Sequence, residues 1–206
     1  AGRTDIEIAR MILLRSGVSA DRIDERLDDL RAATCAEYGR LCPPSLADKV
    51  VPGIVQLLDG LAPRPDVVLS LVTGNLEPVA RIKLERAGLG RYFPAHQGGF
   101  GSDSDDRLDL PPIARRRAGR LLASDDQRDG DGAYPRGRTL VVGDTPRDIA
   151  CARADGLRCL AVTTGPYRAP DLAEADAVAE DVHALEALIE AELERGTPQA
   201  ERTSRL

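Results

Sequence analysis

The pattern of hydrophobic and polar positions divides the chain into a helical first part and a longer part with a different pattern. Apolar residues recur at helical spacing over 6–13, and Thr4 and Glu7 at the start of this segment have the spacing of a capping box. The same spacing continues over 19–41, and two prolines then close it. Two amphipathic helices without a strand predict that residues 1–48 form a small helical subdomain.

Beyond residue 52, short apolar runs alternate with segments of helical pattern. The pattern predicts strands over 67–73, 139–142 and 159–164, and helices over 53–62, 76–88, 110–124, 146–155 and 181–195. The polar stretch SDDQRDGDGAYPRG predicts an exposed loop. Strands that alternate with helices indicate an α/β core with a mainly parallel sheet over residues 49–193. The tail over 194–206 has little apolar surface to bury, so we expect it to be disordered.

Composition and charge narrow the possible functions. The 206 residues carry 34 acidic and 28 basic side chains, and the basic ones are scattered, which argues against a nucleic-acid surface. No apolar run reaches the roughly 18 residues that a membrane helix needs, and the first ten residues do not resemble a signal peptide. The four cysteines show no CxxC spacing, which favours reduced thiols over a zinc site. We therefore expect a cytoplasmic protein that binds neither nucleic acid nor a membrane.

The end of the strand over 67–73 carries the first candidate site. Thr73-Gly74-Asn75 closes that strand, and a helix is predicted to begin directly afterwards. In parallel sheets, ligands bind outside the carboxyl ends of the strands, where helix N-termini attract anions. The Thr73 hydroxyl and the amides of residues 74–76 are therefore candidates for binding one anion. The alternative is an ordinary turn in which Asn75 caps the helix.

A second candidate site follows the strand over 139–142, where the sequence is GDTPRD. Thr145 and Asp148 have the spacing of a capping box, and the proline after Thr145 suits the first helical position. Capping does not explain Asp144, which precedes them at the tip of the strand. Two carboxylates four residues apart form a hard, oxygen-rich site that suits Mg²⁺. We therefore expect Asp144 and Asp148 to ligate magnesium, directly or through water.

Both segments resemble a known family. LVTGN and LVVGDTPRDIACARADGLRCLAVTTG are similar to the second and fourth motifs of the haloacid dehalogenase-like hydrolases, most closely the phosphoglycolate-phosphatase-like branch. The resemblance covers residues 1–190, and GDTPRD is its specific part. It implies a Rossmann-like core with a helical cap. It also implies Mg²⁺-dependent hydrolysis of a small phosphorylated metabolite through an aspartyl-phosphate.

The resemblance implies roles for the residues at both strand ends. Thr73 would donate a hydrogen bond to a phosphoryl oxygen, and Gly74 and Asn75 would shape the phosphate loop. Asp144 would ligate magnesium with help from Asp148. Phosphate binding and metal binding would then meet at the carboxyl ends of parallel strands.

The family's third motif is a basic residue just before the helix that leads to the metal-binding strand. Arg107 stands at that place, where the family usually has lysine. Lys83 is the alternative, but it lies about two turns into a helix, roughly 10 Å along the axis from the phosphate loop. We expect Arg107 to take the role, because a guanidinium can bind a phosphoryl group through two donors. Otherwise Arg107 is a solvated loop charge.

The family's first motif, an apolar strand ending in DxDGT that supplies the nucleophile, has no counterpart in the sequence. Asp129–Ala133 has similar letters but follows a polar run that cannot form a strand. In the family, the missing strand lies between the strands that end at Thr73 and near Asp144. We therefore expect the natural protein to carry such a strand before Ala1, and no turnover from these 206 residues alone.

Two alternative functions remain. Instead of a phosphatase, the chain would then be a non-catalytic relative that keeps the fold as a binding or regulatory module, or a haloacid dehalogenase. The Asp144 and Asp148 pair argues against a dehalogenase, because the pair indicates a metal that this chemistry does not need.

Overall fold

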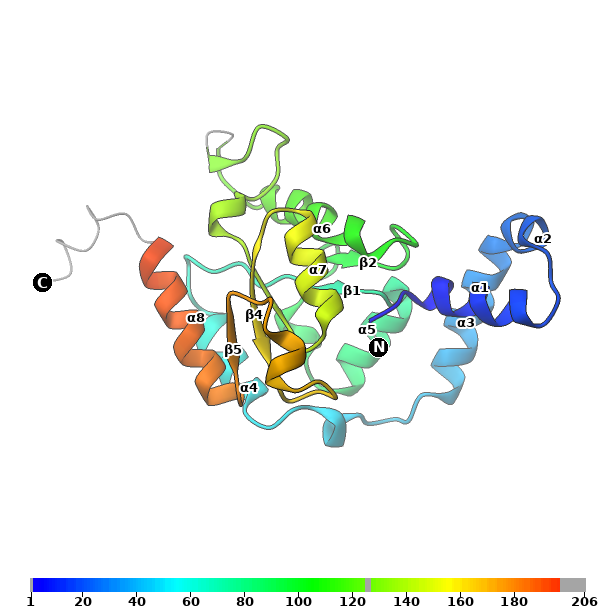
Figure 1. The fold of residues 1–206 in the computed structure, drawn as a ribbon, viewed down its shortest axis with the longest axis horizontal. Coiled ribbons are helices and arrows are strands. Elements are labelled where there is room, and N and C mark those ends of the chain that lie inside the picture. Colours follow the sequence, from blue (N-terminus) through cyan, green and yellow to red (C-terminus); the bar gives the residue numbers. More distant parts are fainter. Residues whose placement is uncertain (1, 125–126, 197–206) are drawn as a thin grey trace, which may run out of the picture.

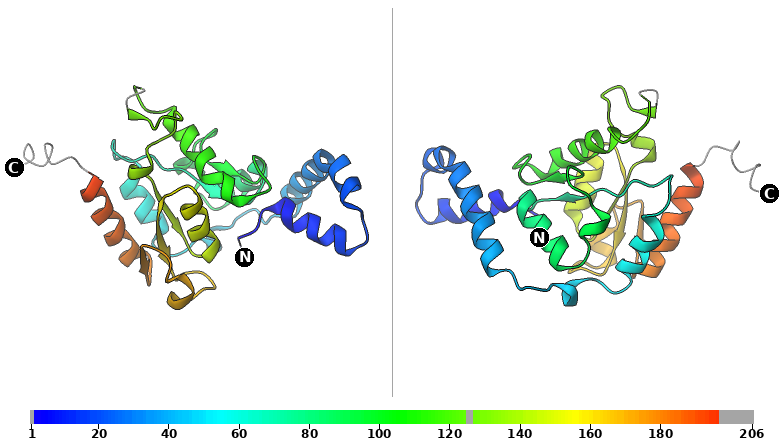
Figure 2. Two further views of the ribbon diagram at one scale, coloured as in Figure 1. Left: turned by 45° about the horizontal axis from the view of Figure 1, so that its top comes forward. Right: turned by 180° about the vertical axis from the view of Figure 1, so that it is seen from behind.

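The computed structural model of the protein describes residues 2–124 and 127–196. Its first part consists of α1 (Asp5–Arg15), α2 (Ala20–Glu25) and α3 (Leu27–Leu41), which project to one side of the sheet region (Figures 1 and 2). Thr4 caps α1, because its side chain accepts a hydrogen bond from Glu7 N. We call α1, α2 and α3 the cap helices.

The remaining elements form an α/β core. The strands are β1 (Val72–Thr73), β2 (Gly99–Phe100), β3 (Leu140–Gly143), β4 (Arg158–Val162) and β5 (Ala177–Ala179). The helices are α4 (Ile54–Leu61), α5 (Glu77–Arg86), α6 (Leu110–Gly119), α7 (Pro146–Ala154) and α8 (Val182–Gly196). β1 pairs with β2, β3 pairs with β4, and β4 pairs with β5, all in parallel. The predicted α/β fold class with parallel strands is confirmed.

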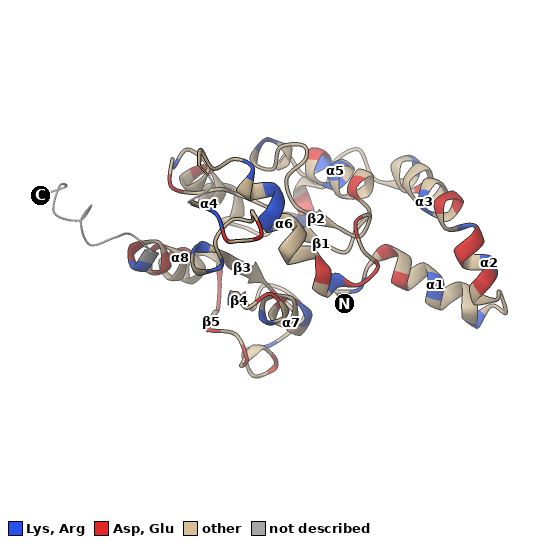
Figure 3. Ribbon diagram, turned by 90° about the horizontal axis from the view of Figure 1, so that it is seen from above, with Lys and Arg blue, Asp and Glu red and all other residues tan. Residues whose placement is uncertain are grey.

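The strands form two sheets that follow one another across the molecule. Seen from above, their order is β2, β1, β3, β4, β5 (Figure 3). Among the described residues no ladder joins β1 to β3, so each of these strands has one edge without a partner strand. Val142, inside β3, is 44% exposed. The gap lies where the family resemblance implies a further strand.

β4 is buried on both faces, which explains its uninterrupted apolar sequence. Leu160 and Val162 pack in one cluster with residues of α4 and α8. Cys159 and Ala161 pack in a second cluster with Ile149 of α7. Because successive strand residues point to opposite faces, helices cover both sides of this sheet.

The cap helices meet the core at α5. Ile6 of α1 is fully buried and packs with Leu76 and Val79 at the start of α5. Tyr38 of α3 packs against the same cluster. The cap is therefore anchored beside the loop that follows β1.

Two predicted helices differ in the structure, whereas those over 53–62, 76–88, 146–155 and 181–195 are confirmed as α4, α5, α7 and α8. The helix over 19–41 is interrupted at Arg26, whose φ of −115° and ψ of 20° are not helical. The helix over 110–124 ends at Gly119. A Cβ on Gly119 would lie 2.9 Å from Ala133 C, so the following loop packs tightly against the end of this helix.

The predicted strands also differ in extent. The strand over 67–73 is reduced to β1, because β2 forms a ladder with only two of its residues. The strands over 139–142 and 159–164 are confirmed as β3 and β4. β2 and β5 were not predicted, since they have two and three residues and little apolar pattern.

The end of the chain differs in part from the expectation. The first residues of the expected disordered tail, 194–196, belong to α8, and the rest of 194–206 lies outside the described residues. Within residues 2–124 and 127–196, the helices are too short or too polar to span a membrane.

Candidate active site

The loop after β1 is covered closely by the start of the chain. A Cβ on Gly74 would lie 2.5 Å from Arg3 O, so only glycine fits at this position. Asp5 N donates a hydrogen bond to Gly74 O at 2.8 Å. Within the loop, Asn75 N donates to Thr73 Oγ1 at 3.2 Å. The Thr73-Gly74-Asn75 loop is therefore held against the first turn of the cap.

A cap carboxylate binds the N-terminus of α5. Asp5 Oδ2 accepts a hydrogen bond from Leu76 N, and Asp5 Oδ1 accepts one from Asn75 Nδ2, both at 2.9 Å. Leu76 is the N-cap of α5 and provides no capping side chain of its own, so Asp5 satisfies one of the orphan amides. Two expectations are therefore wrong: the Leu76 amide does not face an open anion site, and Asn75 is not the N-cap. Sequence reasoning missed Asp5 because Asn75 lies 70 residues away.

The GDTPRD segment forms the predicted capping box at the end of β3. Thr145 caps α7, its side chain accepts from Asp148 N, and the Asp148 carboxylate accepts from Thr145 N at 3.0 Å. Asp148 Oδ2 also accepts from Asp144 N at 3.2 Å. Asp148 thus holds the loop on which Asp144 stands.

Arg107 lies against this loop, in the short 3₁₀ helix η3 (Arg107–Asp109). Its NH2 group donates to Asp148 Oδ1 at 2.5 Å, and the two side chains are only 15% and 11% exposed. Its NH1 group donates to Gly2 O at 3.4 Å. The structure therefore brings Arg107 to the carboxylate pair, and it is not a solvated loop charge.

Lys83 reaches the loop after β1 in spite of its place along α5. Lys83 Nζ donates to Asn75 Oδ1 at 2.8 Å. The distance along the helix axis misled the sequence argument, because helical side chains tilt toward the helix N-terminus and lysine is long. The two basic candidates thus contact different parts of the site, Lys83 the Asn75 side chain and Arg107 the Asp148 carboxylate.

The environment of Asp144 disfavours an isolated negative charge. Burial raises the pKa of the Asp144 carboxyl, and the neighbouring charge of Asp148 raises it further, against a smaller opposing effect of Arg107. The carboxylate lies so close to Gly165 that any side chain there would collide with it. A cation at this point would relieve the repulsion between Asp144 and Asp148.

The carboxylates at the end of β3 fit a metal ion only in part. Asp148 Oδ2 accepts hydrogen bonds from Asp144 N, Thr145 N and Thr145 Oγ1, and Asp148 Oδ1 accepts one from Arg107 NH2. Because both oxygens of Asp148 already have donors, Asp144 is the stronger candidate for direct coordination. In the described part of the chain, no group of three or more His, Cys, Asp or Glu residues is arranged to hold a metal. Further ligands of Mg²⁺ would be water, substrate oxygens or groups outside those residues.

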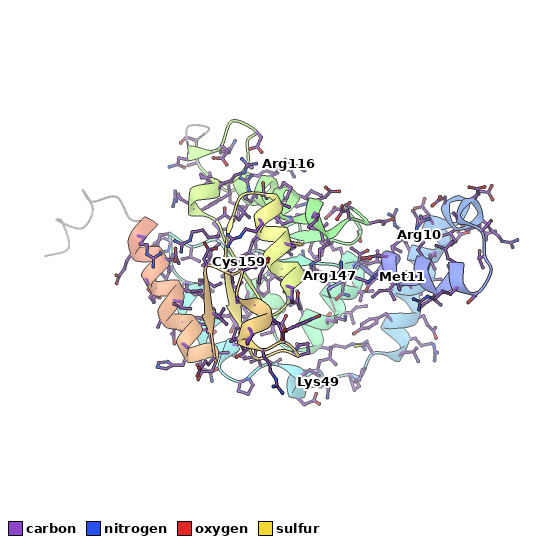
Figure 4. The ribbon with its side chains drawn as sticks, viewed as in Figure 1. Arg10, Met11, Lys49, Arg116, Arg147 and Cys159 are labelled. Carbon is purple, nitrogen blue, oxygen red and sulfur yellow. The ribbon has the colours of Figure 1, made fainter. Side chains whose placement is uncertain are left out.

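A cavity of about 530 Å³ opens beside Arg107, between α1, η3 and α7. Arg147 lies on α7 beside this cavity (Figure 4), and its aliphatic stem packs against Gly2. Its guanidinium has no hydrogen-bond or ion-pair partner in the described part of the chain. The cavity is lined by Glu7, Asp105, Asp106, Arg107, Leu108, Arg147, Ala150 and Cys151. It extends the candidate site toward the cap helices.

The Asp129–Ala133 string has a structural role at a different place. Asp129 Oδ2 accepts from Arg115 NH1 at 3.0 Å, and Asp131 lies 3.8 Å from the same guanidinium. Arg115 is buried and also forms a two-point ion pair with Asp155. The Asp129 and Asp131 carboxylates therefore hold the loop after α6 against the Arg115 side chain of that helix.

Comparison with known proteins agrees with this architecture. Residues 111–185, which include β3, β4 and α7, match the family model described as HAD-hydrolase-like. No curated protein matches the chain at a significant level.

Two solved structures are similar. A putative beta-phosphoglucomutase from Bacteroides vulgatus has a TM-score of 0.62 and 18% identity, over 94% of this chain and 72% of that one. A conserved haloacid dehalogenase-like protein of unknown function from Agrobacterium tumefaciens has a TM-score of 0.53 and 22% identity, over 93% and 79%. At these identities the two structures show a shared fold. The family match, which contains Asp144 and Asp148, covers about a third of the chain, and the two structures show that the whole described chain shares their fold.

Proposed function

We propose that the protein is a cytoplasmic, Mg²⁺-dependent hydrolase of small phosphate monoesters. The observation that carries this proposal is the ion pair between Arg107 and Asp148, at 2.5 Å, beside the carboxylate of Asp144. It holds a permanent cation against one of the two carboxylates at the carboxyl end of a parallel strand, an arrangement suited to a metal and a phosphoryl group. A structural neighbour that is named as a phosphoglucomutase supports a phosphorylated substrate.

Different residues of the site would bind the phosphoryl group and the metal ion. The Thr73 hydroxyl would donate to a phosphoryl oxygen, and Gly74 would let the backbone approach it closely. Arg107 would contribute positive charge near the transferred group, and Asp144 would ligate the metal while Asp148 holds its loop. Bound Mg²⁺ would neutralise part of the phosphoryl charge.

The nucleophile of this chemistry is an aspartate, and the proposal needs a source for it. Asp148 holds the loop through hydrogen bonds to both of its oxygens, and Asp144 is assigned to the metal. The free edges of β1 and β3 provide a place for a further strand that would carry an aspartate between the two strand ends. We assign the nucleophile to such a strand, which the described residues do not include.

A non-catalytic binding protein is the second candidate. It is favoured by one observation, the occupation of the α5 N-terminus by the Asp5 carboxylate, which takes an amide that a phosphate could otherwise use. Turnover by a form of the protein that carries the further strand would exclude it.

Titration calorimetry tests the metal and phosphate sites separately. Asp144→Asn should weaken Mg²⁺ binding at least tenfold, about 1.4 kcal/mol. The matched control Asp48→Asn alters an exposed carboxylate that pairs with Lys49 and should leave Mg²⁺ binding unchanged. Thr73→Val should weaken binding of inorganic phosphate by a similar factor. Unchanged Mg²⁺ affinity in Asp144→Asn would remove the metal from this proposal.

A further inference from the structure

The side-chain amide of Asn75 is held at both ends by charged groups. Its Nδ2 donates to Asp5 Oδ1 at 2.9 Å, and its Oδ1 accepts from Lys83 Nζ at 2.8 Å. Hydrogen bonds to ionised partners are about twice as strong as those between neutral groups. With a carboxylate on one side and an ammonium on the other, the amide has one favoured orientation. A flip would place its oxygen against the Asp5 carboxylate and its NH₂ group against the Lys83 ammonium.

Both partners of Asn75 depend on the cap helices. Asp5 is the first residue of α1. Lys83 belongs to α5, but its ammonium group lies over the ring of Tyr38 of α3, 5.1 Å from the ring centre. Burial raises the pKa of Tyr38 to about 12, so the ring stays a neutral phenol and keeps its cation–π contact. Removal of the cap would therefore take away Asp5 and expose the Lys83 ammonium to water.

The backbone of Asn75 contacts the Thr73 hydroxyl, the group proposed to bind the phosphoryl oxygen. The Asn75 peptide is fixed on both sides, because Asn75 N donates to Thr73 Oγ1 at 3.2 Å and Asn75 O accepts from Gly101 N at 2.8 Å. Since Thr73 Oγ1 already accepts this bond, its single hydrogen is free to point elsewhere and donate. A fixed Asn75 thus leaves the Thr73 hydroxyl directed as a donor.

We propose that Asp5 and Lys83 are positioning residues that lock Asn75, so that docking of the cap helices sets the phosphate-binding geometry of the loop after β1. This rests on the proposed function in one respect, that the loop binds a phosphoryl group. Neither residue touches the phosphate. Both act through Asn75, and through it on Thr73.

The test uses the 206-residue chain and two single variants, Asp5→Asn and Lys83→Met, with their double variant. Asp5→Asn keeps the shape of the side chain and removes its charge, and Lys83→Met keeps most of the aliphatic stem. The chain offers a matched control, because Lys49 is its only other lysine and is 73% exposed. Lys49→Met should behave as the unaltered protein in every measurement.

The first readout is the Asn75 side-chain amide in ¹H–¹⁵N NMR spectra without any anion. In the unaltered protein its two protons should give well-separated resonances that exchange slowly with water. In Asp5→Asn and in Lys83→Met the separation should collapse toward that of an exposed asparagine. Unchanged Asn75 resonances in both variants would overturn the proposal that Asp5 and Lys83 fix the orientation of this amide.

The second readout is the affinity for inorganic phosphate. Each single variant should bind phosphate about five- to tenfold more weakly, and the double variant should lose little more than either, since both act on one group. Lys83→Arg keeps the cation and should stay within about twofold of the unaltered protein. Tighter phosphate binding by Asp5→Asn would overturn the proposal, because Asp5 would then be a competitor of phosphate. A loss of thermal stability with unchanged phosphate affinity would also overturn it and leave a structural role.

The two readouts separate this inference from the proposed function. If the unaltered protein binds no phosphate and Thr73→Val changes nothing, the phosphate site fails, and the inference falls with it even where the NMR spectra show the lock. If phosphate binds and depends on Thr73 but is indifferent to Asp5 and Lys83, the proposed function stands and the inference fails.

Discussion

Replacing Arg107 with methionine removes the cation that joins η3 to the end of β3. In the structure its NH2 group lies 2.5 Å from Asp148 Oδ1, and the two side chains are 15% and 11% exposed. Methionine preserves much of the aliphatic volume but offers no donor. The Asp148 carboxylate would then keep the three donors on Oδ2 and lose the only donor on Oδ1 among the described residues.

The expected cost follows from this loss. A hydrogen bond to a charged group contributes about 1.5–3 kcal/mol to stability, and an uncompensated buried charge can cost about 3–5 kcal/mol. Because Asp148 keeps three donors, the lower range applies, and we expect Arg107→Met to reduce the free energy of unfolding by about 2 kcal/mol. For a protein of this size, that corresponds to a fall in Tm of roughly 4–8 °C.

Urea unfolding followed by circular dichroism measures this loss. Arg107→Met, Asp148→Asn and the double variant form a thermodynamic cycle, in which the coupling energy should exceed about 1 kcal/mol. Arg26→Met is the matched control, because Arg26 and Asp29 also form a pair at 2.5 Å but are 71% and 68% exposed. An exposed pair contributes at most about 1 kcal/mol. If Arg107→Met costs no more than Arg26→Met, the ion pair does not hold the site together and the reasoning is refuted.

Three further outcomes are expected. The 206-residue chain should not hydrolyse p-nitrophenyl phosphate with Mg²⁺, because it lacks a counterpart of the family's nucleophile motif; metal-dependent turnover would contradict this. Arg115→Met should cost about 1.5–3 kcal/mol in urea unfolding, since it removes the two-point partner of Asp155, which is 3% exposed and keeps Arg136 as a donor; a cost below about 1 kcal/mol would contradict it. Burial alone would raise the pKa of Asp176, but bonds from Cys159 N and arginines outweigh it and lower the pKa. Asp176 therefore stabilises the fold above its unfolded pKa of about 3.9, and this contribution is lost as pH falls through the folded pKa. The stability difference between the unaltered protein and Asp176→Asn should thus be largest near neutral pH and shrink in acid; a difference independent of pH would argue against it.

Local sequence patterns correctly predicted those elements that neighbouring residues in the chain specify. The capping box of Thr145 and Asp148 is formed by residues three apart, so spacing alone was sufficient to predict it. The run CLAV predicted β4 because both faces of that strand are covered by helices, which requires apolar residues at every position. The polar loop around Asp129 was also recognised, although its pairing with Arg115 was not.

Sequence patterns did not predict features that depend on a residue or strand far away in the chain. The strand over 67–73 has the composition of a strand throughout, but a ladder forms only where another backbone lies alongside, and β2 provides two residues. Lys83 was set aside on its position along α5, yet the fold turns its side chain back to Asn75. Asp5 was assigned only to the start of a helix, because nothing in its neighbourhood indicates that it binds the loop after β1.

The sequence by itself determined the class of fold, the two strand ends that carry Thr73 and Asp144, and the helical character of the first forty residues. These follow from short-range periodicity and from residue types that the backbone requires locally. The tertiary structure alone decided that Arg107 meets Asp148, that Asp5 and Lys83 hold Asn75 between them, and that β1 and β3 each keep a free edge. Such contacts join residues far apart in the chain, and their geometry is set by how helices and strands pack, which no local pattern encodes.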